Sequence, residues 1–185
     1  LMKMLPGMVV VSPCDFNQTR AATIAIYDYL GPVYLRFGRP KVPNFTQPEK
    51  PFEIGKADIL TEGKDVTIIA NGHLVWEALE ANNSLSKIGI NAEVINFATI
   101  KPLDLSTLLK SAKKTGRVVT AEEHQKNGGL GDSVAQALAL HNPCPMEIVG
   151  VNDSFGESGK PDELMKKYGL DSSAIVDAVK SVLKR

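Results

Sequence analysis

Short apolar runs alternate along this chain with longer segments in which apolar residues recur at helical spacing. The runs are typical of buried strands: Met8–Val11, Val33–Phe37, Val66–Ala70, Ala92–Phe97, Arg117–Ala121 and Glu147–Val151. Three helical faces stand between or after them: Ala22, Ala25, Ile26, Tyr29 and Leu30; Leu105, Leu108, Leu109 and Ala112; Ile175, Val176, Val179, Val182 and Leu183. The alternation predicts a layered α/β fold with a mostly parallel sheet, because parallel neighbours need crossover helices.

Residues suited to helix ends support this division. Those suited to N-termini are Asp104, Asp171 and Pro161, and those suited to C-termini are Gly31, Gly116 and Gly169. Asp15 or Ser12, after the first strand, is interpreted as another helix cap. Further helices are expected after Asn71-Gly-His73 and after the glycine-rich stretch that ends at Gly131.

A cluster of prolines from Arg39 to Pro51 marks the clearest boundary. Repeated prolines continue neither a strand ladder nor a helix, so this stretch is predicted to be an extended linker. We divide the chain into residues 1–40, a linker at 41–51 and a domain at 52–185. The first part is too small to fold alone and is expected to be the end of a larger α/β domain.

The composition is that of a soluble globular protein. Lys plus Arg (21) equals Asp plus Glu (21), which argues against a nucleic-acid or membrane-surface partner. The sequence has no apolar stretch of about 18 residues, so no transmembrane helix is predicted. The chain opens at Leu1 rather than Met and has no recognisable signal peptide, so a trimmed start is expected. Cys14 and Cys144 are far apart in sequence and are interpreted as reduced thiols of a cytoplasmic protein.

Arg36 and Arg39 sit at the end of the strand predicted at 33–37. Ligands of open α/β sheets collect beyond the carboxyl ends of strands, where the forked guanidinium could bind a phosphate. The alternative is that both arginines only cover a strand edge.

The glycine-rich stretch after Glu122 is the second candidate. Free N–H groups at a helix N-terminus can hold an anion, which makes His124, Gly128, Gly129 and Gly131 a candidate anion site. However, the dinucleotide motif fails at Val134, and Glu122 would repel a phosphate. A structural loop, or one that contacts a partner subunit, is the favoured interpretation.

The histidines predict no chemistry by themselves. No carboxylate is fixed beside His73 by the sequence, so a capping or solvent-facing role is favoured over that of a general base. His141 is expected to end a helix. Because the three histidines share no ligand spacing, no metal site is predicted.

Several stretches, in order, resemble transketolases. They are Ser12-Pro-Cys-Asp15, Leu35-Arg-Phe-Gly-Arg-Pro40, Asn96 to Asp104, Thr120-Ala-Glu-Glu-His124 with Gly128-Gly-Leu-Gly131, and Ser158-Gly-Lys-Pro161 to Gly169. The resemblance covers the whole chain and implies the end of a pyrimidine-binding domain followed by a complete transketolase C-terminal domain with three α/β/α layers. A split transketolase, made of two chains, is a further implication.

The resemblance also implies a reaction, the transfer of a two-carbon ketol unit from a ketose phosphate to an aldose phosphate in the pentose phosphate pathway. The complete enzyme uses thiamine diphosphate and Mg. Arg39 matches the family's arginine that binds the sugar phosphate, and Arg36 is the weaker match. The expected partners are the remaining transketolase domains or an N-terminal subunit, a second copy in a homodimer, and sugar phosphates.

This chain matches neither the family's Gly-Asp-Gly…Asn motif, which holds metal and diphosphate, nor the glutamate that activates the cofactor. No catalytic, cofactor-binding or metal residue is therefore assigned, and the chain alone is expected to be inactive. Two alternatives stay open. One is a non-catalytic dimerisation or regulatory ligand-binding domain, and the other is part of an enzyme like deoxyxylulose-phosphate synthase.

Overall fold

A mostly parallel five-stranded sheet forms the centre of the molecule. The computed structural model describes residues 1–39 and 41–185. The strand order is β3-β5-β4-β7-β8, and only β3 pairs antiparallel, along β5. The strands span β3 Asp58–Thr61, β4 Val66–Ala70, β5 Ala92–Asn96, β7 Val118–Gln125 and β8 Met146–Val151.

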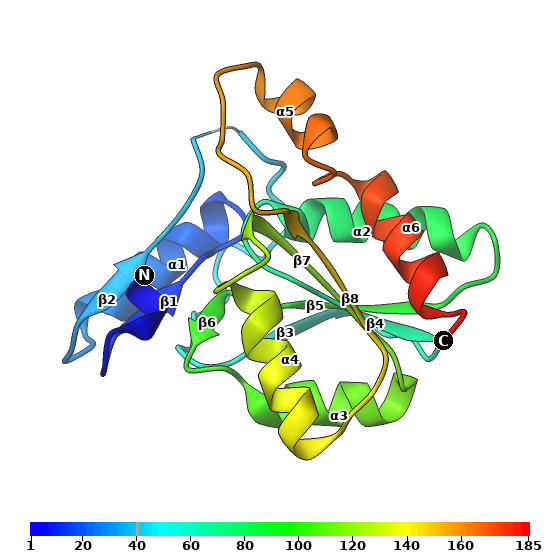
Figure 1. The fold of residues 1–185 in the computed structure, drawn as a ribbon. Coiled ribbons are helices and arrows are strands. Elements are labelled where there is room, and N and C mark those ends of the chain that lie inside the picture. The colour runs from blue at the N-terminus through cyan, green and yellow to red at the C-terminus, as the bar shows by residue number, and fades with distance from the viewer. Residues whose placement is uncertain (40) are drawn as a thin grey trace.

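Helices cover both faces of this sheet, as Figure 1 shows with α2 and α6 above it and α3 and α4 below. Their bounds are α2 Leu74–Ser86, α3 Leu105–Thr115, α4 Leu130–His141 and α6 Ser172–Val182. One buried cluster joins α2 and α6 to the sheet, and a second joins α3 and α4 to its other face. The predicted three-layer α/β/α architecture is thereby confirmed.

The first residues of the chain form a smaller sheet at one side. Its order is β2-β1-β6, with β1 Val9–Val11 parallel to β2 Val33–Leu35 and antiparallel to β6 Thr99–Lys101. The short 3-10 helix η1 (Met2–Met4) and α1 (Phe16–Tyr27) accompany it. Because β6 follows β5 closely, this pairing ties the start of the chain directly to the central domain.

The structure corrects several predicted elements. Strands β3 and β6 were not predicted. Strand β7 runs on to Gln125, so Glu122–Gln125 lie in the strand and not in the glycine-rich loop. Helix α1 ends at Tyr27, so Tyr29 and Leu30 lie beyond it and are exposed, and Gly31 does not cap it.

Most of the predicted helix ends are confirmed. Asp15, Asp104 and Asp171 each accept a hydrogen bond from the first turn of α1, α3 and α6. Pro161 opens α5 (Pro161–Lys167), Gly116 ends α3 in a left-handed conformation, and His141 is the last residue of α4.

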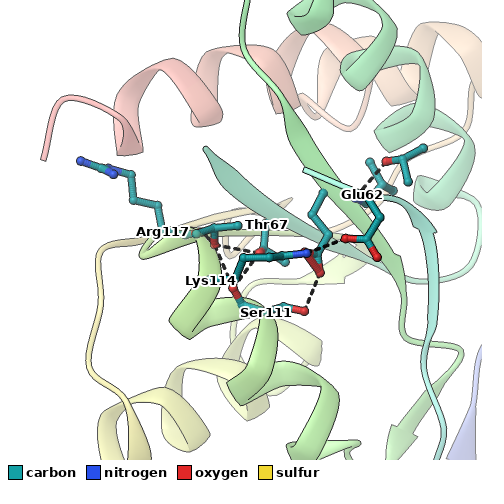
Figure 2. A network of polar contacts seen from close by, with 9 residues as sticks. Glu62, Thr67, Ser111, Lys114 and Arg117 are labelled. Atoms are coloured by element: carbon teal, nitrogen blue, oxygen red, sulfur yellow. Dashed lines mark hydrogen bonds and ion pairs between the residues drawn. The ribbon is translucent and has the colours of Figure 1, made fainter. Parts of the chain in front are cut away.

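A polar network holds α3 against one face of the sheet, near the amino ends of β4 and β5 (Figure 2). The fully buried carboxylate of Glu93 on β5 accepts a hydrogen bond from Ser111 Oγ at 2.5 Å and is ion-paired with Lys114. Lys114 also contacts Glu62 at 2.7 Å, and Thr67 on β4 bonds Thr115 at 2.8 Å. A buried charge is stable only with such partners, so Glu93 fixes the position of α3.

Across the described parts of the chain, no helix combines the length and apolarity needed to cross a bilayer.

Candidate functional site

The two arginines that follow β2 have different surroundings. Arg36 is half-buried, and its backbone N–H donates to Val11 O at 2.8 Å. Its Nη2 donates to Glu123 O on β7, also at 2.8 Å. Arg39 is exposed, and Pro40 beside it lies outside the described residues. Arg36 therefore fastens the end of β2 to the central domain, whereas Arg39 is presented to solvent.

Arg36 also lines a cleft of about 450 Å³. His73 after β4, Gln125 at the end of β7 and Val151 at the end of β8 line it too, so the cleft lies at the carboxyl ends of three parallel strands. This is the edge at which open α/β sheets bind ligands. The loop after β8 and helix α5 form the opposite wall, where Tyr168 Oη donates to Phe155 O at 3.1 Å.

The glycine-rich helix N-terminus already holds an anion of the chain itself. The buried carboxylate of Glu122 accepts hydrogen bonds from Leu130 N at 2.7 Å and from Gly131 N at 2.8 Å. Burial raises the pKa of Glu122, and the N–H groups of Gly131 and Leu130 lower it only in part. An external anion would have to displace Glu122 to reach these donors.

Residues around this loop hold it in place. Lys3 Nζ donates to Gly129 O at 2.8 Å and to Ser133 Oγ at 3.0 Å. The backbone N–H of Gly128 donates to the Asp132 carboxylate. These contacts join η1, the loop and α4.

The two histidines near the cleft do not form a catalytic pair with a carboxylate. His73 stands at the N-cap of α2 without a side-chain cap bond. The exposed ring of His124 lies with Nδ1 2.8 Å from Gln125 O and 4.0 Å from Glu122 Oε2. At 4.0 Å the Glu122 carboxylate is beyond hydrogen-bond reach of the His124 ring, so it does not orient that imidazole.

The described residues do not fit a metal–diphosphate group. In residues 1–39 and 41–185, no three His, Cys, Asp or Glu side chains gather in a way that could hold a metal ion. The one glycine-rich helix N-terminus singled out by sequence is filled by Glu122.

A contact that sequence reasoning missed fastens the segment after Arg39. The Asp15 carboxylate, besides capping α1, accepts hydrogen bonds from Phe45 N at 2.9 Å and Thr46 N at 2.8 Å. The sequence signals only the cap, because the approach of residues 45 and 46 depends on the tertiary fold. The stretch 41–51 has no helix or strand, in line with the proline cluster, but it is not detached from the domain.

Comparison with known proteins shows what the chain is similar to. The family model "Transketolase, C-terminal domain" matches residues 55–175. The chain is 45% identical over its whole length to the 6-deoxy-6-sulfo-D-fructose transketolase subunit SqwH of Clostridium sp. (strain MSTE9). It is 39% identical, again over its whole length, to a subunit of the apulose-4-phosphate transketolase of Phocaeicola vulgatus. It spans 58% of the first protein and 59% of the second.

A solved structure matches at the level of the whole fold. It is described as a split gene transketolase, inactive beta4 tetramer, and superposes with a TM-score of 0.96 at 48% identity. The match covers 99% of this chain and 60% of that one. The expected family is confirmed, and the relatives are transketolase-type transferase subunits. This chain belongs to the transketolase family and carries its C-terminal domain.

Proposed function

We propose that this chain is the C-terminal part of a thiamine-diphosphate-dependent transketolase that transfers a two-carbon ketol unit between sugar phosphates. The observation that carries the proposal is the likeness over the whole chain to transketolase subunits, 45% identical in the first relative. The pentose phosphate pathway and a cytoplasmic location are part of the same proposal.

Within that enzyme we assign residues 1–40 to the end of the pyrimidine-binding domain, 41–51 to the linker and 52–185 to the C-terminal domain. The family match at residues 55–175 supports the last of these. Because the described residues do not fit a metal–diphosphate group, thiamine diphosphate and Mg belong in the parts of the enzyme outside this chain. Binding and orienting the substrate is what this chain can contribute.

Arg39 is the residue proposed to recognise the substrate's anionic end. It is exposed just beyond β2, and a planar guanidinium matches two oxygens of a phosphate at once. The names of the relatives are consistent with this chemistry, since one acts on a sulfo sugar and another on a sugar phosphate. Arg36 is the second candidate. It lines the cleft, but one of its N–H groups already donates to Glu123 O.

The test is Arg39→Ala in the assembled enzyme, with phosphorylated and unphosphorylated ketoses as donors. A hydrogen bond to a charged group is worth about 1.5–3 kcal/mol, so kcat/KM for the phosphorylated ketose should fall about 10- to 150-fold. Because the phosphate is remote from the reacting carbon, much of the loss should appear in KM. Arg39→Lys should recover only part, since an ammonium is not forked. An equal loss for both donors would contradict the assignment.

A partner is proposed from the apolar surface of the first part of the chain. Most of the exposed large apolar side chains lie in residues 1–37, among them Met4, Phe16, Tyr27, Leu30 and Phe37. Such surface is expected to be covered by the remaining transketolase domains or by an N-terminal subunit. A homodimer of the complete enzyme remains our proposal, and the tetramer of the solved relative is an arrangement of that chain alone.

Reconstitution decides between this function and the alternatives. Mixing this chain with the missing domains should produce ketol transfer between sugars. A complex that forms but transfers no ketol unit would favour the non-catalytic or synthase-like interpretations.

A further inference from the structure

The segment that carries Arg39 is fastened at its downstream end by one buried carboxylate. Asp15 is only 3% exposed and receives four hydrogen bonds. Oδ1 accepts from Gln18 N at 2.8 Å and Thr46 Oγ1 at 2.7 Å, and Oδ2 accepts from Phe45 N at 2.9 Å and Thr46 N at 2.8 Å. One bond caps α1, while the other three hold residues 45 and 46.

Neighbouring contacts strengthen this attachment. Phe16 N donates to Asn44 Oδ1 at 3.1 Å, and Asn17 Nδ2 donates to Thr46 O at 2.7 Å. The ring of Phe45 packs against Trp76 of α2 with centroids 5.8 Å apart. Residues 44–46 are thus fixed to both α1 and α2.

The upstream end of the same segment is fastened at Arg36. Its backbone N–H binds Val11 O, the last residue of β1, and its guanidinium binds Glu123 O on β7. Asp15 lies four residues beyond Val11. Along the chain, Arg39 therefore lies between two attachments, one at Arg36 and one at residues 44–46.

We propose that Asp15 is a positioning residue for Arg39, and that it places the guanidinium for the anionic end of the sugar by fixing residues 44–46. The inference rests on the proposed function of Arg39. A loop fixed at both ends loses less conformational freedom when the ligand binds, and a displacement of about 1 Å can cost as much as 100-fold in rate. Asp15 itself touches no substrate in this role.

Asp15→Ser distinguishes the role of Asp15 as the cap of α1 from its role in holding residues 45 and 46. Serine is as good an N-cap as aspartate, so the bond from Gln18 N can be kept. Its single short hydroxyl has no second oxygen for Phe45 N and Thr46 N. Thr46→Val is a milder variant that removes one hydrogen bond and keeps the volume of the side chain.

The chain offers a matched control in Asp104. It caps α3 through Thr107 N at 3.1 Å and also accepts from a distant backbone N–H, that of Ala57 at 3.1 Å. Asp104→Ser therefore makes the same chemical change at a second buried cap, whose hydrogen bonds run to Ala57 and Thr107 instead of residues 44–46.

Kinetics in the assembled enzyme give the first readout. Asp15→Ser should lower kcat/KM for a phosphorylated ketose by about 5- to 10-fold, mostly through KM. The kcat/KM for an unphosphorylated ketose should change by less than about 2-fold. Thr46→Val should act in the same direction but less. Asp104→Ser should leave the ratio of the two values unchanged.

Trypsin gives a second readout that does not depend on activity. Lys41 is the one tryptic site between residues 37 and 50, because Arg39 and Lys50 each precede a proline. Asp15→Ser should speed cleavage after Lys41 at least about 5-fold, since a local attachment is lost, and Asp104→Ser should not.

The outcomes separate the two proposals. If Arg39→Ala is selective for phosphorylated ketose but Asp15→Ser is not, the positioning role is wrong and the role of Arg39 stands. If Arg39→Ala is not selective, the role of Arg39 fails and the positioning role fails with it. An equal, unselective loss in Asp15→Ser and Asp104→Ser, or unchanged cleavage after Lys41, also overturns the positioning role.

Discussion

Gly129 is the position where a single methyl group should do the most damage to the glycine-rich loop. A Cβ there would lie 2.5 Å from Cδ and Oε1 of Glu122 and closer still to Oε2. The backbone of Gly129 is extended (φ −94°), so alanine fits its conformation, and the whole penalty comes from the collision. The collision must push the Glu122 carboxylate off its two N–H donors.

The magnitude follows from those two bonds. Each hydrogen bond to a charged group contributes about 1.5–3 kcal/mol, so losing both in Gly129→Ala should lower the free energy of unfolding by about 3–6 kcal/mol. Gly128→Ala is the neighbouring control: nothing lies within 4 Å of its Cβ, but its φ of +81° is left-handed. Strain of that kind costs about 1–2 kcal/mol.

Urea unfolding followed by circular dichroism measures these differences from the midpoints at constant slope. The decisive measurement is a double-mutant cycle with Glu122→Ala, which removes the carboxylate that the methyl group would meet. In that background Gly129→Ala should cost less than about 1 kcal/mol. A cost that is the same in both backgrounds would refute the reasoning.

Three other changes test separate parts of the structure. Lys114→Met should lower the free energy of unfolding by about 3 kcal/mol, because it leaves the buried Glu93 carboxylate with Ser111 alone. Glu62→Gln, at the exposed end of the network, should change that free energy little. Equal effects of the two substitutions would contradict this reasoning. For Asp15 and Asp104, burial alone would raise the carboxyl pKa, but hydrogen bonds outweigh it and lower the pKa below the ordinary 3.8. The stability from these groups is therefore fully present above pH 3.8 and lost as the pH falls through the lowered pKa values. The free energy of unfolding should decrease below pH 3.8, and Asp15→Ser should make this decrease smaller. Calorimetric titration of this chain with thiamine diphosphate and Mg should show no saturable binding at micromolar cofactor, and stoichiometric binding would contradict the assignment of the cofactor to other parts of the enzyme.

Local signals explain what the sequence predicts well. The strand at Val66–Ala70 has the predicted bounds because its five residues are all buried and the polar residues on either side end the run. Asp104, Asp171 and Gly116 were recognisable because a cap is decided within one turn of a helix. The order of layers then follows from alternation alone.

Tertiary pairing explains what the sequence misses. Strand β6 has three residues and exists because β1 approaches it from the other end of the chain. The last residues of β7 are polar and were interpreted as loop, yet Gln125 pairs with Val151 of β8. In each case the partner strand, and not the local pattern, determines the conformation.

The same limit applies to the two candidate anion sites, which look alike in sequence. Both the glycine-rich turn before α4 and the Arg36–Arg39 stretch offer donors beyond the end of a strand. In the fold the first set of donors is satisfied by Glu122, from the strand just before it, and one N–H of the Arg36 guanidinium is used by Glu123 O. Arg39 is the donor that stays exposed, on a segment held at both ends. Which group is left for a ligand depends on which carboxylates and carbonyls the fold brings within about 3 Å, the reach of a hydrogen bond. The exposure of Arg39 is therefore consistent with the substrate role that we propose for it.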